Sequence, residues 1–357
     1  MDRVSWTEAV PLLAAQTGTV ILMGAVDVGK TTLTLEAANA VVRGGRSAAI
    51  LDTDLGQGEI GPPGTIGVVR LEAPVASIAD IRPRALAFVG DTAPYGHLLA
   101  VLQGTHRLVT HALSRRDQVV FVDTSGVPGG MHGRMPEKLK LAKVAVLNPS
   151  MVVFLEKENE LERLAGLVAG WTAAPRLRVQ SPPDVRRKSP VYRRIRRAHR
   201  MRRHFEQAKL LDLDAGQARV FDAWLYTGTA LTARQLQFVS SALKTEVPHG
   251  EITADGIYLC AASRPAREGF VLLHEEFGRK RITVTPAAVF QNLLVGLIGP
   301  GGHLLDIGLL QGVNFERALL SILTPARSVA EVTQIHFGRL RVRPDGSEIA
   351  HLRPSDI

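Results

Sequence analysis

The sequence predicts an α/β fold, with a doubly wound parallel sheet in the first part of the chain and a smaller β-rich domain after it. Up to about residue 170, short apolar runs alternate with amphipathic stretches, which is typical of a parallel sheet covered by helices. From about Ala218, short strand-like runs alternate with turns. Because 357 residues exceed what one core usually holds, we expect two domains, residues 1–215 and 216–357.

The first apolar run, residues 19–23, predicts a buried strand that leads into a glycine-rich loop and a helix. The loop and the helix start consist of Gly24, Ala25, Val26, Asp27, Val28, Gly29, Lys30, Thr31 and Thr32. In this context backbone N–H groups can face phosphate oxygens, Lys30 can reach the β- and γ-phosphates, and the Thr31 hydroxyl can ligate Mg²⁺. We therefore expect a P-loop NTPase-type domain, and a chance glycine-rich turn is the less favoured alternative.

Two further apolar strands end in carboxylates. Residues 47–51 lead to Asp52 and Asp54, and residues 119–122 lead to Asp123. Because the carboxyl ends of parallel strands form the edge where α/β sheets bind ligands, these side chains should lie near the phosphates, with Asp123 near Mg²⁺.

The remaining elements follow from periodicity and turn signals. In the first domain we expect strands at 85–90 and 151–155, helices at 97–113, 139–146 and 158–169, an ordered loop at 58–67 and a glycine-rich segment at 127–134. In the second domain we expect strands at 256–261, 270–273, 281–284 and 340–342, a hairpin turn at 299–302 and a turn at 344–346.

The positive charge is concentrated in one segment. The formal net charge is +9, and ten cations without any acid lie between Arg186 and Arg203. Such a segment suits a polyanion, whether a triphosphate, a nucleic acid or a membrane surface.

Ser189 and Pro190 suit the start of a helix that runs to about Phe205. Its apolar arc would hold Val191, Ile195, Ala198, Met201 and Phe205, and its arginine arc Arg193, Arg196, Arg197, Arg200 and Arg203. A solvated charged face or a localisation tag is the alternative for this helix.

Composition excludes several classes of protein. The single cysteine, Cys260, excludes an intrachain disulfide and a cysteine-based zinc site. No apolar run approaches the roughly 18 residues of a membrane span, and no signal-peptide pattern opens the chain. We expect a soluble, cytoplasmic protein without a membrane partner.

Several motifs together resemble the polyribonucleotide 5′-hydroxyl kinase family, which includes archaeal polynucleotide kinases and the kinase-like subunit of the eukaryotic pre-mRNA cleavage factor. Beside the phosphate loop, they are Asp54-Leu55-Gly56-Gln57, the Pro-Gly loop at 62–67, residues 88–94, a substrate clasp at Asp123-Thr124-Ser125-Gly126, the lid pair Arg193 and Arg197, Asp306-Ile307-Gly308-Leu309 and residues 315–325. The resemblance covers most of the chain.

The resemblance implies transfer of the γ-phosphate of ATP or GTP to the 5′-hydroxyl of RNA or DNA, in RNA processing or repair. Asp54 would be the base, and Arg193 and Arg197 would close over the γ-phosphate beside Lys30. Thr31 and Asp123 would hold Mg²⁺. Substrate contacts would come from Gln57, Pro63, Gly64, Thr124, Ser125, Gly126, Arg200 and Arg203.

The sequence departs from the family at the clasp and leaves alternatives open. Val127 stands where eukaryotic members have a base-stacking Trp. The domain that precedes the phosphate loop of the eukaryotic subunit is not expected here, so tethering to that machinery is not expected either.

A nucleotide-dependent RNA-binding switch or adaptor is one alternative, and a small-molecule kinase is another. The preference for RNA or DNA, the phosphate donor, the pathway, protein partners and the oligomeric state stay open.

Overall fold

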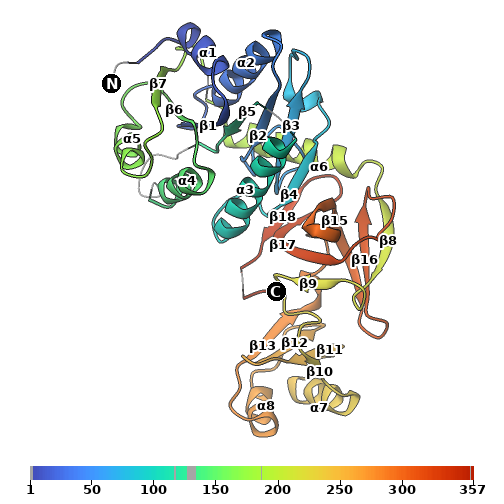
Figure 1. Ribbon diagram of the computed structural model, residues 1–357. Coiled ribbons are helices and arrows are strands. Elements are labelled where there is room, and N and C mark those ends of the chain that lie inside the picture. Colours follow the sequence, from blue (N-terminus) through green and yellow to red (C-terminus); the bar gives the residue numbers. More distant parts are fainter. Residues whose placement is uncertain (1–2, 116–117, 127–133, 186, 354) are drawn as a thin grey trace. The chain divides into compact units, whose positions relative to one another are not determined.

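The computed structural model describes the chain except residues 1–2, 116–117, 127–133, 186 and 354. Its contacts divide the chain into two compact units, Met1–Arg197 and Ala198–Ile357 (Figure 1). The sheets and hydrophobic cores of the described residues each lie within one unit.

The first unit is built on a sheet that, among the described residues, has seven strands in the order β4-β3-β2-β5-β1-β6-β7. The strands are β1 (Gly18–Gly24), β2 (Ala48–Asp52), β3 (Thr65–Leu71), β4 (Ala85–Phe88), β5 (Val119–Asp123), β6 (Met151–Glu156) and β7 (Arg176–Gln180). Neighbouring strands from β2 to β7 in this order are parallel, whereas β3 runs antiparallel to both β2 and β4. The predicted P-loop-type α/β fold is confirmed, and β3 and β7 are additions to the prediction.

Helices cover both faces of this sheet because successive strand residues point to opposite sides. Ile21 and Val122 pack in a core with residues of α3, α4 and α5, while Leu22 and Phe121 pack in a second core with residues of α1 and α2. These helices are α1 (Trp6–Ala14), α2 (Lys30–Arg43), α3 (Leu98–Ser114), α4 (Arg134–Leu147) and α5 (Glu162–Ala169).

The basic segment forms α6 (Pro190–Phe205), within which the division between the units falls. Ser189 caps it, because its Oγ accepts a hydrogen bond from the Tyr192 N–H at 3.1 Å, as predicted.

Among its described residues, the second unit contains two sheets. One has the order β18-β17-β14-β15-β16-β8, with β9 beside β17, and the other has the order β10-β11-β12-β13. The strands are β8 (Lys209–Asp214), β9 (Arg219–Phe221), β10 (Thr229–Ala230), β11 (His249–Ile252), β12 (Ile257–Ala261), β13 (Ile282–Pro286), β14 (Leu293–Ile298), β15 (Leu304–Asn314), β16 (Leu319–Thr324), β17 (Gln334–Val342) and β18 (Glu348–His351). The β-rich C-terminal domain is confirmed, and the expected turn at 299–302 joins the antiparallel strands β14 and β15.

One predicted strand is a helix. Residues 270–273 lie in α8 (Gly269–Phe277), which packs against α7 (Ala233–Leu243). Its buried residues, Gly269 and Leu273, are four apart, which is the spacing of a helix face. Four consecutive apolar residues do not distinguish a helix from a strand, and this explains the wrong prediction.

The division into units also differs from the expected boundary after residue 215. The strand β8 lies before that boundary, yet it pairs along its whole length with β16 of the second unit. Strand pairing between residues about a hundred positions apart leaves no local signal in the sequence.

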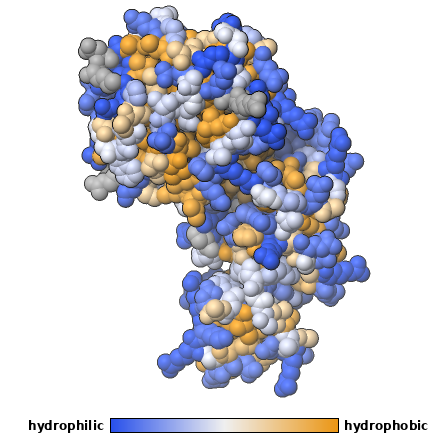
Figure 2. Space-filling view, in the orientation of Figure 1, coloured by the Kyte–Doolittle hydropathy of each residue, from blue (hydrophilic) through white to orange (hydrophobic). Residues whose placement is uncertain are grey.

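Figure 2 shows hydrophobic areas among hydrophilic residues on both units, one of them at the end of the second unit where Figure 1 draws α7 and α8. There Val271 and Leu272 of α8 are exposed. Among the residues that the structure describes, no helix combines the length and the hydropathy that a membrane crossing requires.

We expect the Arg178→Met substitution to destabilise the first unit. Arg178 Nε donates to Glu156 Oε1 at 2.6 Å, and Glu156 is fully buried. Glu156 Oε1 also pairs with Arg3 Nε at 3.3 Å, so removing Arg178 leaves the buried carboxylate with this longer ion pair. We expect a loss of about 3 kcal/mol in the free energy of unfolding in urea. Arg163→Met is the control, because its 71% exposed side chain pairs with Glu137 at the surface and should cost less than about 1 kcal/mol. Equal losses for the two variants would contradict this view of Glu156.

Candidate active site

The phosphate loop lies between β1 and α2 and holds an unusual backbone conformation. Asp27 and Gly29 have positive φ angles of 55° and 97°, and α2 begins at Lys30. A Cβ on Gly24 would lie 2.6 Å from the Leu155 carbonyl oxygen, so only glycine fits there. The loop therefore presents the N-terminus of α2, with its unpaired N–H groups, to an anion.

A cavity of about 600 Å³ opens over this loop. The predicted site residues that line it are Val26, Asp27, Val28, Gly29, Lys30, Thr31, Thr32, Asp54, Gln57, Asp123, Thr124, Ser125, Gly126, Arg193 and Arg197. Thus the phosphate loop, the Asp54–Gln57 turn, the clasp and the lid pair, which are far apart in the sequence, meet in one cavity of the first unit.

Lys30 is 8% exposed, and its Nζ donates to the Ala25 carbonyl oxygen at 2.6 Å. Burial lowers the pKa of Lys30, and the neighbouring carboxylates of Asp123, Asp54 and Asp27 oppose this shift. Lys30 therefore folds back over its own loop, where phosphate oxygens could replace the carbonyl as acceptors.

Asp52 and Asp123 are buried opposite each other, because they are partners in the register of β2 and β5. Burial raises the pKa of Asp52 to about 7, and the nearby charges of Asp123 and Asp54 add to the shift. Burial likewise raises the pKa of Asp123 to about 6, although Lys30 and a hydrogen bond from Thr31 favour its ionised form.

Thr31 Oγ1 donates to Asp123 Oδ2 at 2.5 Å. A hydroxyl and a carboxylate beside a phosphate loop fit Mg²⁺, which in such sites takes few protein oxygens together with phosphates and waters. The part of the chain that the structure describes holds no cluster of three or more His, Cys, Asp or Glu side chains suited to a metal ion.

Asp54 and Gln57 form a tight turn after β2. Asp54 Oδ1 accepts hydrogen bonds from the Gly56 and Gln57 N–H groups at 3.1 and 2.8 Å, which fixes the carboxylate. Gln57 Nε2 donates to the Gly56 carbonyl at 2.9 Å, whereas the buried Gln57 Oε1 has no hydrogen-bond partner among the described residues. A buried acceptor without a partner points to a donor supplied by a ligand or a water.

Pro63 and Gly64 are buried behind this turn and do not belong to the described lining of the cavity. The Gly64 N–H donates to the Leu55 carbonyl at 3.1 Å, and its carbonyl accepts from Val89 and Gly90 at 3.0 Å. The contacts of Gly64 therefore support the turn.

The clasp packs onto the phosphate loop. Thr124 Oγ1 donates to the Leu22 carbonyl at 2.7 Å, and a Cβ on Gly126 would lie 2.8 Å from the Val26 nitrogen. Glycine is therefore needed where the two segments touch. The segment 127–133 lies outside the described residues. It includes Val127, the position at which the sequence departs from the family.

The lid pair faces the cavity from α6. Arg193 Nη2 pairs with Asp27 Oδ2 of the phosphate loop at 2.5 Å, while the buried Arg193 Nε has no hydrogen-bond partner among the described residues. Arg197 lines the cavity, whereas Arg200 and Arg203 lie further along α6 in the second unit.

Sequence reasoning did not assign four charged residues of this region to the site, although it placed one of them, Arg196, on the arginine arc of the helix. Arg196 lines the cavity and pairs with Glu59 at 2.5 Å, and Lys140 and Lys143 of α4 are buried beneath the carboxylates. One sequence feature could have indicated the two lysines: they lie three residues apart within the otherwise apolar helix at 139–146.

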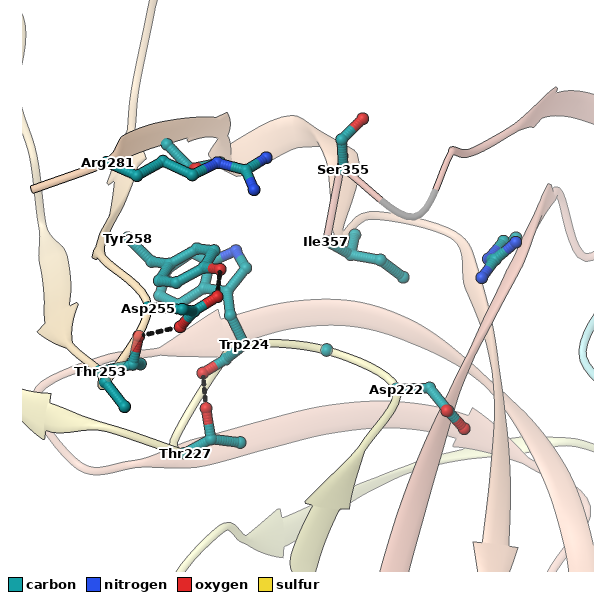
Figure 3. Close-up of a pocket in the computed structure, with 13 residues that line it drawn as sticks. Asp222, Trp224, Thr227, Thr253, Asp255, Tyr258, Arg281, Ser355 and Ile357 are labelled. Carbon is teal, nitrogen blue, oxygen red and sulfur yellow. Dashed lines mark hydrogen bonds between the residues drawn. The ribbon is translucent and has the colours of Figure 1, made fainter. Parts of the chain in front are cut away.

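A second cavity, of about 680 Å³, lies in the second unit (Figure 3). Figure 3 shows the stacked rings of Trp224 and Tyr258, with centroids 5.7 Å apart, and Asp255 accepting hydrogen bonds from Thr253 and Tyr258. Its described lining includes neither a phosphate loop nor a lysine. The phosphate loop and Lys30 line the cavity of the first unit.

Comparisons with known proteins agree with this geometry. The family model described as "mRNA cleavage and polyadenylation factor CLP1 P-loop" matches residues 24–207, just over half of the chain. The polyribonucleotide 5′-hydroxyl-kinase of Thermococcus kodakarensis is 30% identical over 95% of this chain and 92% of its own length. That of Pyrococcus horikoshii is 29% identical over 94% of this chain and 88% of its own length.

Among solved structures, wild-type Clp1p in complex with a Pcf11p segment matches with a TM-score of 0.58 and 12% identity, over 94% of this chain and 79% of that chain. At this identity the likeness shows the fold alone. The family model and the curated relatives go further and confirm the resemblance predicted from the motifs: the chain belongs to the CLP1 P-loop family.

Proposed function

We propose that this protein transfers the γ-phosphoryl group of ATP or GTP to the 5′-hydroxyl end of an RNA or DNA strand. The observation that carries the proposal is that one cavity holds a phosphate loop with Lys30 together with a carboxylate and an amide, Asp54 and Gln57, suited to a hydroxyl nucleophile. The names of the archaeal relatives support the kinase activity and RNA as the substrate. The family description supports a place in RNA processing.

The phosphate loop and Lys30 would bind the β- and γ-phosphates. Lys30 Nζ would exchange the Ala25 carbonyl for phosphate oxygens, at little cost because one acceptor replaces another. Thr31 and Asp123 would hold Mg²⁺, which when bound neutralises charge on the phosphate oxygens.

Asp54 and Gln57 would act on the nucleophile. As the 5′-oxygen bonds to the γ-phosphorus and the bond to the β–γ bridging oxygen breaks, Asp54 would accept the proton of the hydroxyl. Gln57 Oε1, which lacks a described partner, would accept a hydrogen bond from a hydroxyl of the substrate end.

The lid arginines would stabilise the transferred group. Arg193 can offer its Nε, and Arg197 lies one turn further along the same helix face. A forked guanidinium suits the charge that spreads over the phosphoryl oxygens. Arg200 and Arg203 would serve the backbone phosphates of the strand.

The first test is whether the purified protein, with Mg²⁺ and γ-labelled ATP or GTP, labels a 5′-hydroxyl oligonucleotide. An otherwise identical 5′-phosphorylated oligonucleotide is the control and should stay unlabelled, because it offers no nucleophile. Release of label only as free phosphate would instead favour a nucleotide-dependent switch. Comparing RNA with DNA in the same assay identifies the preferred strand.

The second prediction concerns the base. Asp54→Asn should retain nucleotide affinity while transfer falls by roughly 10²–10⁴-fold, because the amide cannot take the proton. Single-turnover labelling together with nucleotide titration measures both quantities. Asp80→Asn, at an exposed carboxylate of the 3-10 helix Ile78–Asp80, is the matched control and should leave transfer unchanged. Full transfer by Asp54→Asn would refute the assignment.

The third prediction separates chemistry from strand binding on α6. Arg197→Lys keeps the charge but loses the fork, so turnover at saturating oligonucleotide should fall with little change in oligonucleotide affinity. Replacing Arg200 and Arg203 together by Ala should weaken binding and flatten its salt dependence, because fewer counterions are released. Arg194→Lys, at an exposed position of the same helix, is the control. If both variants lost oligonucleotide affinity and kept full turnover at saturating oligonucleotide, α6 would bind nucleic acid without a role in phosphoryl transfer.

A further inference from the structure

Two lysines of α4 are almost completely buried. Lys140 is 2% exposed and Lys143 is 1% exposed. Lysine is rarely buried to this degree without partners, and the two residues, three positions apart, share one helix face. Their ammonium groups therefore need polar partners inside the fold.

Lys143 contacts the segment that carries the proposed base. Its Nζ donates to Thr53 Oγ1 at 2.7 Å, and Thr53 lies between Asp52 and Asp54. Thr53 in turn donates from its Oγ1 and its N–H to the Asp123 carbonyl, at 2.9 and 3.0 Å. Lys143 thus fixes the junction at which the ends of β2 and β5 meet.

Lys140 contacts the clasp. Its Nζ donates to Thr124 Oγ1 at 2.8 Å and to the Ser125 carbonyl at 2.6 Å. Because Gly126 of the same segment touches Val26 of the phosphate loop, Lys140 holds the clasp against the nucleotide site.

Both lysines also face the carboxylates of the site. Burial lowers the pKa of Lys143 to about 8, and the nearby Asp54, Asp52 and Asp123 oppose this shift. Burial also lowers the pKa of Lys140, the nearby charges of Lys143 and Lys30 add to this shift, and Asp123 and Asp54 oppose it. Two apolar side chains would have filled the same space without this desolvation cost.

We propose that the two lysines are positioning residues for phosphoryl transfer, with Lys143 aligning the turn that carries Asp54 and Lys140 aligning the clasp that receives the strand end. This inference rests on the proposed kinase function. It separates the two lysines by role: Lys143 acts on the nucleophile and its base, and Lys140 acts on the binding of the substrate.

The test replaces each lysine by methionine, which keeps the length of the side chain and removes the charge. Lys143→Met should lower kcat by about 10–100-fold, the usual effect of losing a supporting contact behind a reacting group, with the KM for the oligonucleotide and the nucleotide affinity unchanged. Lys140→Met should raise the KM for the oligonucleotide by a similar factor and leave kcat near that of the wild type. A purely structural role would lower Tm in both variants without this split between kcat and KM.

Thr53→Val provides a second route to the same contact. If Lys143 acts through Thr53, the double variant Thr53→Val/Lys143→Met should be no slower than the slower single variant, whereas independent effects would multiply. Should Lys143→Met fail to fold, Thr53→Val alone decides: a lower kcat at unchanged nucleotide affinity supports the proposal, and an unchanged kcat overturns it.

Lys138→Met is the matched control, because Lys138 is exposed on the same helix and should give wild-type kinetics. Wild-type kcat and KM in the two buried variants would overturn this inference and leave the kinase function intact. Absence of transfer by the wild-type protein would overturn the proposed function, and this inference with it.

Discussion

Burial of charge at one edge of the first sheet is the constraint on which the site depends. Asp52, Asp123, Lys30, Lys140 and Lys143 are all less than 10% exposed. An unpaired buried ion costs several kcal/mol, so each of these groups must find partners in the fold. The partners come from backbone carbonyls, threonine hydroxyls and the opposite charges, which means that the chain can bury these groups only if the loops after β1, β2 and β5 keep their conformations.

Those conformations are set by rigid elements and by a few close approaches. The parallel register of β2 and β5 puts Asp52 beside Asp123, and Thr53 then ties the two strand ends together. Position 58 must be glycine in this arrangement, because a Cβ there would lie 2.4 Å from the Asp54 carbonyl oxygen and 2.9 Å from the Asp52 carboxylate. A site built in this way is preorganised before nucleotide binds, and preorganised charge is what phosphoryl transfer requires of the protein.

The features of the site that depend on neighbouring residues in the chain could be predicted from the sequence. The phosphate loop, Asp123 and the Ser189 cap depend on residues within one strand, loop or helix, and each lies where expected. The helix at 270–273 was missed because four apolar residues fit either period. The Arg196–Glu59 pair and the contacts of Lys140 and Lys143 join segments far apart in the chain. Their burial follows from tertiary packing, which composition and periodicity do not contain.

The two halves of α6 are held by different interactions, although the same amphipathic pattern runs through the whole helix. Its apolar arc predicts one buried face, yet Val191 and Ile195 are 62% and 63% exposed, whereas Met201 and Phe205 are 2% and 5% exposed. In the first half, order comes instead from the opposite arc, where Arg193 and Arg196 pair with Asp27 and Glu59. Ion pairs with loop residues are weaker constraints than a buried apolar face, because water and phosphate oxygens compete for the guanidinium groups. The half of α6 that carries Arg193, the first residue of the proposed lid pair, is therefore the half whose contacts phosphate oxygens can replace.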